Sequence, residues 1–303
     1  MRFLSFFALL FAAPVLIAAS QPLVLEPSSQ WVLDYGDDSC RLLRTFGADK
    51  DKATIVFEKS SPRSPMSLLI VGPAVQVSDD ARDSTGEFQP VERSTFKDGV
   101  SVKSTETHHD AILWRNVSFA DPAMFPELKD RKDPESADLV RIQLNRDAIL
   151  QSVNGRATQV ESIAILPRHH RALELKSGTM GEAMKMMNQC TRDELAGWGI
   201  DPKIDDKIAV PARPIGMLNW IGPDDYPMEA VMRGLESSFQ FRVNVDASGR
   251  VTDCHIATSV QAPEINDRIC EKIKARARFK PAELADGTKV PDYFSNTMVF
   301  QVR

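Results

Sequence analysis

Short apolar runs separated by turn residues dominate the first two thirds of the chain. The runs are rich in Val, Ile, Leu and Phe, and Gly, Asp, Ser and Pro clusters bound them, which is typical of β-strands. A helical period replaces this pattern at 178–199, where Ala183 and Cys190 share one face. The strand candidates are WVLDY (31–35), CRLLRTF (40–46), ATIVFEK (53–59), MSLLIVGPAVQV (66–77) and the stretch 101–119. We therefore predict a β-rich N-terminal domain with a late helix over residues 21–200.

The end of the chain follows the order helix, strand, strand, helix, strand. Phe239, Phe241 and Val243 alternate with polar residues, as expected for a half-buried strand. The predicted elements are helices at 226–238 and 263–277 and strands at 239–245, 251–259 and 292–302. A Pro-rich segment without a sustained period comes before them and predicts a linker at 201–225. The overall class is α+β, with a small C-terminal domain at 226–303.

The first twenty residues have the pattern of a secretory signal peptide. Arg2 supplies the positive charge, a nearly continuous apolar run follows, and small residues end it at Ala19 and Ser20. We expect cleavage of residues 1–20 and export of the rest of the chain. The alternative is an uncleaved helix that anchors the chain in the inner membrane.

Composition and motifs argue against several classes of protein. The chain has 303 residues, 43% of them hydrophobic, and a formal net charge of −5, so a nucleic-acid binder is not expected. Motifs for a metalloprotease, a serine hydrolase or a phosphate-binding loop are missing. The adjacent histidine pairs fit surface loops better than a metal site. We therefore predict no enzyme activity, no cofactor and no metal, with an unrecognised enzyme site in 21–200 as the alternative.

Six sequence features in the C-terminal unit, in this order and spacing, resemble the TonB C-terminal domain family, over about residues 223–303. They are Tyr226-Pro227, FRVNVDASGRV (241–251), Thr258-Ser259, Ile265-Asn266-Asp267, RARFKPA (276–282) with Asp286-Gly287, and MVFQV (298–302). The resemblance implies a small α+β fold in which a helix packs on an antiparallel sheet. It also implies that a short peptide, the TonB box of outer-membrane receptors in TonB itself, adds as a strand beside residues 293–302.

The resemblance thereby points to a peptide-binding edge strand. Unpaired N–H and C=O groups of such an edge pair with an extended peptide, and alternate side chains tune specificity. The resemblance, together with the signal peptide, implies a periplasmic protein. The partner would be a TonB-box-like peptide of an outer-membrane receptor or another envelope protein, in TonB-dependent transport. A structural homodimer through the same strand is the alternative. The implied strand residues are Tyr293, Ser295, Thr297, Val299 and Gln301.

The four cysteines allow three disulfide connectivities, and an oxidising compartment favours bridges. Cys254 lies in the second strand of the C-terminal unit and Cys270 on the helix expected to cover the sheet. We predict Cys254–Cys270, and then Cys40–Cys190 between an early strand and the late helix of the N-terminal domain. Buried thiols are the alternative.

A basic run surrounds Phe279, with Arg276, Arg278 and Lys280 as its nearest cations. It could bind an anionic partner, but the acidic residues in the first half of the same helix favour another interpretation. Cations at a helix C-terminus stabilise the helix dipole. We expect Phe279 to fill the core and the cations to form the polar end of the helix.

Overall fold

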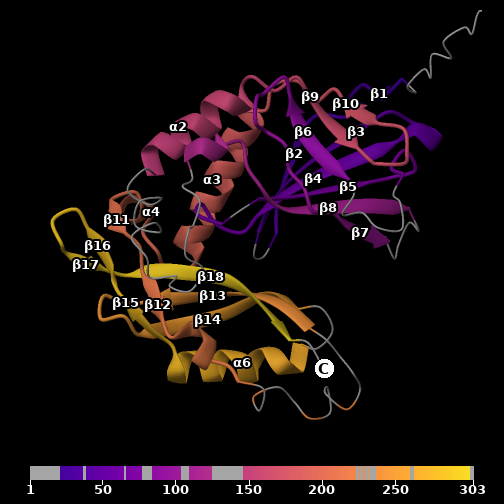
Figure 1. The fold of residues 1–303 in the computed structure, drawn as a ribbon. Helices are drawn as coiled ribbons and strands as arrows, with labels where there is room; N and C mark the ends of the chain where they lie inside the picture. Colours follow the sequence, from indigo (N-terminus) through magenta and orange to yellow (C-terminus); the bar gives the residue numbers. More distant parts are fainter. Residues whose placement is uncertain are drawn as a thin grey trace, which may run out of the picture.

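The computed structural model describes residues 21–300 with internal gaps (Figure 1). Its described residues contain two large hydrophobic cores and a small third cluster of Leu195, Ile200 and Tyr293. The gaps are 37–38, 65, 77–83, 104–108, 125–145, 223–224, 226–227, 229–231, 233–236 and 260–262. The first core gathers residues between Leu25 and Cys190, and the second gathers residues between Ile208 and Val290. We call the parts that carry them the N-terminal unit and the C-terminal unit. The expected signal peptide, 1–20, lies outside the described residues.

A six-stranded antiparallel sheet forms much of the N-terminal unit, with the order β2-β3-β4-β5-β8-β7. Alternate residues of its central strands are buried, which is why Leu42, Ile55 and Leu68 point into one core. The stretch 101–119, predicted as one or two strands, supplies the last two. The strands are β2 (Val32–Tyr35), β3 (Cys40–Phe46), β4 (Ala53–Lys59), β5 (Met66–Val71), β7 (Val100–Lys103) and β8 (Asp110–Val117).

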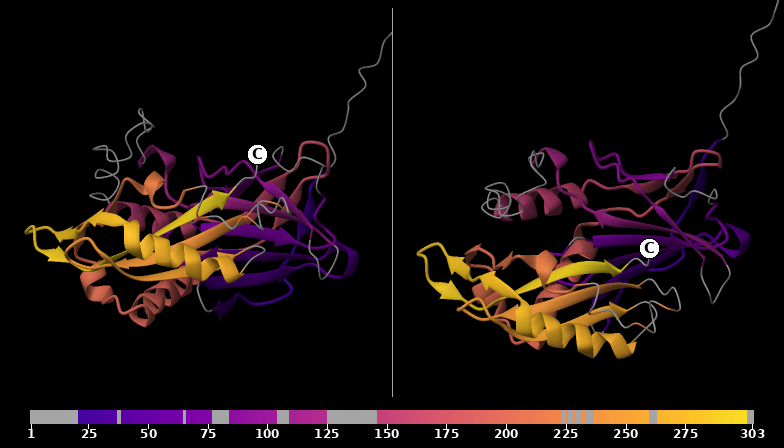
Figure 2. Two further views of the ribbon diagram at one scale, coloured as in Figure 1. Left: turned by 90° about the horizontal axis from the view of Figure 1, so that it is seen from below. Right: turned by 60° about the horizontal axis from the view of Figure 1, so that its bottom comes forward.

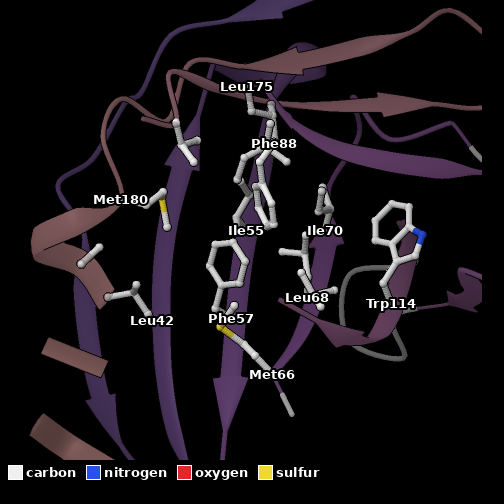
Figure 3. Packing of buried hydrophobic residues seen from close by; sticks show 14 of the residues in the cluster. Leu42, Ile55, Phe57, Met66, Leu68, Ile70, Phe88, Trp114, Leu175 and Met180 are labelled. Atoms are coloured by element: carbon white, nitrogen blue, oxygen red, sulfur yellow. The ribbon is translucent and has the colours of Figure 1, made fainter. Parts of the chain in front are cut away.

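A smaller sheet of four strands, in the order β1-β10-β9-β6, packs across this core together with two helices. Figure 3 shows Phe88 of β6 and Phe57 of β4 in the same cluster, and their ring centroids lie 6.3 Å apart. The elements are β1 (Leu23–Leu25), β6 (Thr85–Gln89), β9 (Ser162–Leu166), β10 (Leu173–Leu175), α2 (Arg146–Ala157) and α3 (Gly181–Gly197), with short 3-10 turns η1 (Asp49–Asp51) and η3 (Pro122–Met124).

The C-terminal unit is built on a three-stranded antiparallel sheet with the order β14-β13-β18. Its strands are β13 (Ser237–Val245), β14 (Val251–Ser259) and β18 (Asp292–Phe300), and the helix α6 (Pro263–Arg276) follows β14. Ile269 and Ile273 of α6 are buried together with Phe241 and Val243 of β13. Figure 2 shows α6 on one face of this sheet and the N-terminal unit behind the other.

The segment predicted as a linker, 201–225, contains short elements that pair with the C-terminal unit. β11 (Ile208–Val210) pairs with β16 (Ala282–Leu284), and β12 (Arg213–Ile215) pairs with β15 (Arg278–Lys280). The remaining elements are α4 (Pro202–Asp205), η4 (Met217–Asn219) and β17 (Lys289–Val290). This part of the chain therefore lies against the C-terminal unit instead of spanning free space between two domains.

Both disulfides are present in the expected pairing. Cys40–Cys190 joins β3 to α3 with a Cα–Cα distance of 6.0 Å, and Cys254–Cys270 joins β14 to α6 at 5.5 Å. No helix among the described residues is long and apolar enough to cross a membrane.

Candidate partner-binding strand

The strand β18 lies at an edge of its sheet. It pairs with β13 along its whole length, from Asp292 opposite Val245 to Phe300 opposite Ser237. On its other side, no strand of the described chain pairs with it. Every second residue of an edge strand directs its N–H and C=O outward, so β18 offers a row of groups that an extended segment can pair with.

The residues predicted for peptide binding lie on this strand, except that Gln301 falls outside the described residues. Backbone pairing sets Tyr293 opposite Asn244, Ser295 opposite Arg242 and Thr297 opposite Gln240. Val299 pairs with Ser238 in the same register. Because strand side chains alternate, the side chains of Tyr293 and Ser295 lie on one face of the sheet.

That face packs on the N-terminal unit. Trp198, directly after α3, makes an edge-on contact with Tyr293 at 5.6 Å between ring centroids, and the Arg242 guanidinium lies 4.1 Å from the Trp198 ring centroid. The Asn244 side-chain amide donates to the Trp198 carbonyl at 2.8 Å. The Gln240 amide donates to the Ser60 hydroxyl at 2.9 Å. The expected peptide-reading face is therefore partly occupied by the protein's own chain.

A buried ionic cluster closes the beginning of β18. Arg63, in the turn between β4 and β5, donates to the Asp292 carboxylate at 3.1 Å and to the Tyr293 hydroxyl at 3.0 Å. It also pairs with Asp205 of α4 at 3.2 Å. Both aspartates are fully buried, and the Arg63 side chain retains 20% exposure. The Ala212 N–H adds a bond of 2.8 Å to Asp292.

The positive charge of Arg63 and the negative charges of Asp205 and Asp292 stabilise each other. Burial by itself would lower the pKa of Arg63, but Tyr293, Asp292 and Asp205 outweigh it and raise that pKa. Burial raises the pKa of the Tyr293 phenol, which thus stays protonated and can accept from Arg63 through its oxygen. The sequence contains no local signal for this cluster, because Arg63 and Asp292 are 229 residues apart.

The opposite face of the sheet explains two of the motifs behind the family resemblance. Phe279 is 4% exposed and packs against Trp220 and Phe294, with centroid distances of 5.1 and 5.4 Å. Its backbone N–H donates to the Gly249 carbonyl at 2.9 Å. The hairpin turn DASGR and the motif RARFKPA are thus in direct contact, and Phe279 fills the core as predicted.

The basic run is used within the fold. Arg276 pairs with Asp225 and donates to the Trp220 carbonyl at 3.1 Å. Arg278 donates to the Ala275 and Ala277 carbonyls at the end of α6, at 3.1 and 2.7 Å. These contacts fit the interpretation as the polar end of a helix.

Two other regions of the N-terminal unit gather polar groups. An open hollow of about 630 Å³ is lined by polar and apolar residues that include Arg93, Lys97 and Arg115. Among the described residues, the one set of possible metal ligands is Cys40, Cys190 and Glu194, and its two sulfurs are bonded to each other.

Comparison with known proteins identifies part of the chain. Residues 223–302 match the family described as the Gram-negative bacterial TonB protein C-terminal. A solution NMR structure of the Pseudomonas aeruginosa TonB C-terminal domain is similar at 24% sequence identity, with a TM-score of 0.24, and the match covers 30% of this chain and 87% of that one. No curated protein sequence matches. The family match assigns residues 223–302 to a TonB-type C-terminal domain, and the assignment applies to this segment of the chain alone.

Proposed function

We propose that this chain is a non-enzymatic periplasmic protein of the Gram-negative envelope that binds a partner by strand addition to β18. The observation that carries the proposal is the free edge of β18, which pairs with β13 on one side and with no described strand on the other. The TonB-type domain supports a role in envelope transport or partner binding. The fitting partner is an extended TonB-box-like peptide of an outer-membrane receptor or of another envelope protein.

A titration of the full-length mature protein with a TonB-box peptide tests this proposal. Backbone amide resonances of Ser295–Phe300 should shift in a ¹⁵N TROSY spectrum, because new main-chain hydrogen bonds form there. A control peptide with alternate amides N-methylated lacks the donors on one edge and should leave these resonances unchanged. Shifts confined to other regions, or none at millimolar peptide, would rule out the proposal.

The same edge also suits a second copy of this chain, since unpaired edges associate with one another. Solution mass distinguishes this candidate from the first. A monomer whose β18 resonances respond to peptide supports a receptor-type partner, whereas a dimer that peptide dissociates shows that both partners compete for the edge.

A further inference from the structure

The two ends of β18 differ in how accessible their backbone is. Asp292 and Tyr293 are 0% and 3% exposed as whole residues, main chain included. Ser295 and Asn296 keep intermediate exposure. A partner strand can pair only with backbone groups that it can reach, so the first end of the edge is closed to it.

The closure comes from the N-terminal unit and from α4. Arg63 touches both Asp292 and Tyr293, whose side chains point to opposite faces of the sheet. Because β13 occupies one edge of β18, Arg63 must pass around the other edge or around the start of the strand. Either path places the Arg63 guanidinium at the start of β18, next to the position where a partner strand would begin.

Building on the strand-addition function, we propose that the N-terminal unit sets the register of the partner. Arg63 and Trp198 restrict pairing to the Ser295–Phe300 end of β18, and release of this contact lengthens the edge that a partner can use. The selected partner is then a short extended segment, about six residues long. While Arg63 and Trp198 contact the start of β18, a longer extended segment forms no additional main-chain hydrogen bonds and binds no more tightly.

The contact between the two units depends on a single positive charge, that of Arg63. Its one guanidinium holds two fully buried carboxylates, those of Asp205 and Asp292. Without Arg63 these carboxylates would repel each other in a buried site, which favours separation of the two units. Trp198 adds a contact between the two units that does not involve Arg63, because it packs on Tyr293 and Arg242.

The test compares two TonB-box peptides on the full-length mature protein by calorimetry and TROSY. One has about six residues, and the other carries the same residues with about three more at each end, so that either strand direction reaches Asp292. The variants are Arg63→Ala, Trp198→Ala and, as the control, Arg41→Ala. Arg41 pairs with Asp34 on the exposed strand β2. If Arg63→Ala fails to fold, Trp198→Ala alone carries the comparison.

We expect equal Kd values for the two peptides, within about twofold, in the wild type and in Arg41→Ala. In Arg63→Ala and Trp198→Ala the longer peptide should bind about tenfold more tightly, since extra main-chain bonds become available. A wild type that already prefers the longer peptide tenfold, or variants that gain no preference, would overturn the register proposal while leaving strand addition intact. If neither peptide binds any protein, strand addition itself fails.

Discussion

Single residues explain why the turn between β13 and β14 has its sequence. Gly249 has φ of +83°, and a Cβ atom there would lie 2.0 Å from the Phe279 carbonyl oxygen. Asp246 accepts from the backbone N–H groups of Ser248 and Arg250, at 2.8 and 3.0 Å. The turn thus combines a conformation that favours glycine with a contact too close for any side chain.

A comparison of two glycines with the same φ separates the effect of the left-handed conformation from that of the close contact. Gly287 also has φ of +83°, but a Cβ atom there would have no other atom within 4 Å. Gly287→Ala should lower the free energy of unfolding by about 1–2 kcal/mol, the cost of the left-handed conformation alone. Gly249→Ala should lower it by about 3 kcal/mol or more, because the Phe279 backbone must also move. Urea unfolding measures both, and equal losses would contradict the close-contact argument.

The ionisation of Asp225 makes the stability of the C-terminal unit depend on pH. The hydrogen bond from Arg276, together with the Gly222 N–H, holds the pKa of Asp225 below its ordinary value. Since the folded pKa is the lower one, the stabilisation is complete above about pH 4 and is lost as the pH falls through the lowered pKa. Asp225→Asn should therefore flatten the loss of stability that sets in as the pH falls below about 4.

Thermal unfolding across this pH range provides the measurement for Asp225. Arg276→Gln should flatten the same window, and the double variant should add little beyond either single change, because both remove one pair. If the Asp225→Asn protein lost stability with falling pH as steeply as the wild type, the pair of Asp225 and Arg276 would not contribute to stability.

At the scale of elements, the sequence predicts most of the C-terminal unit. The alternation in β13 and the isoleucine spacing in α6 are local signals, and each reflects one buried face. The strand β9 is ambiguous from its sequence, since a short apolar run fits a strand or a buried helix segment. The helix α2 was not predicted, because RDAILQSVNGRA has no clear apolar stripe.

The interdomain contacts could not be predicted from local pattern. Arg63 lies in the turn SSPRSP, which looks like any polar loop, and its partners come from the distant α4 and β18. Likewise, alternation places Tyr293 and Ser295 on one face but does not tell what covers that face. Such information is non-local and becomes visible only when the two units are seen together.

The two disulfides should differ in their effect on stability. Cys40–Cys190 closes a loop with a sequence separation of 150, and Cys254–Cys270 one with a separation of 16. The chain-entropy relation assigns them about 5 and about 3 kcal/mol. We expect the double serine variant at Cys40 and Cys190 to lose more stability in guanidinium unfolding than the double variant at Cys254 and Cys270. The reverse order would contradict this account of the bridges.

At the scale of the whole molecule, the sheet β14-β13-β18 is covered on both faces. α6 covers one face, and the turn around Arg63 together with Trp198 covers part of the other (Figure 2). Under the proposed strand addition, a partner would therefore pair with the end of β18 that lies away from Arg63. The N-terminal unit and the TonB-type domain contact each other through Arg63, Trp198 and Ser60.

The Arg63 cluster should contribute strongly to global stability. Removing one partner of a buried ionic group costs about 3–5 kcal/mol, so Arg63→Ala should lower the free energy of unfolding by that amount. Arg41→Ala, which breaks an exposed pair with Asp34, should change it by about 1 kcal/mol or less. Similar small effects for both variants in urea unfolding would show that the cluster does not hold the two units together.

Hydrogen exchange along β18 in the full-length protein, measured with and without a TonB-box peptide, tests the central claim most directly. The amides of Asp292 and Tyr293 should already be protected without peptide, and their exchange should not change. Amides at Ser295–Phe300 that point away from β13 should exchange readily and become protected when the peptide binds. Protection that appears at the Asp292 end, or no change anywhere along β18, would contradict the account.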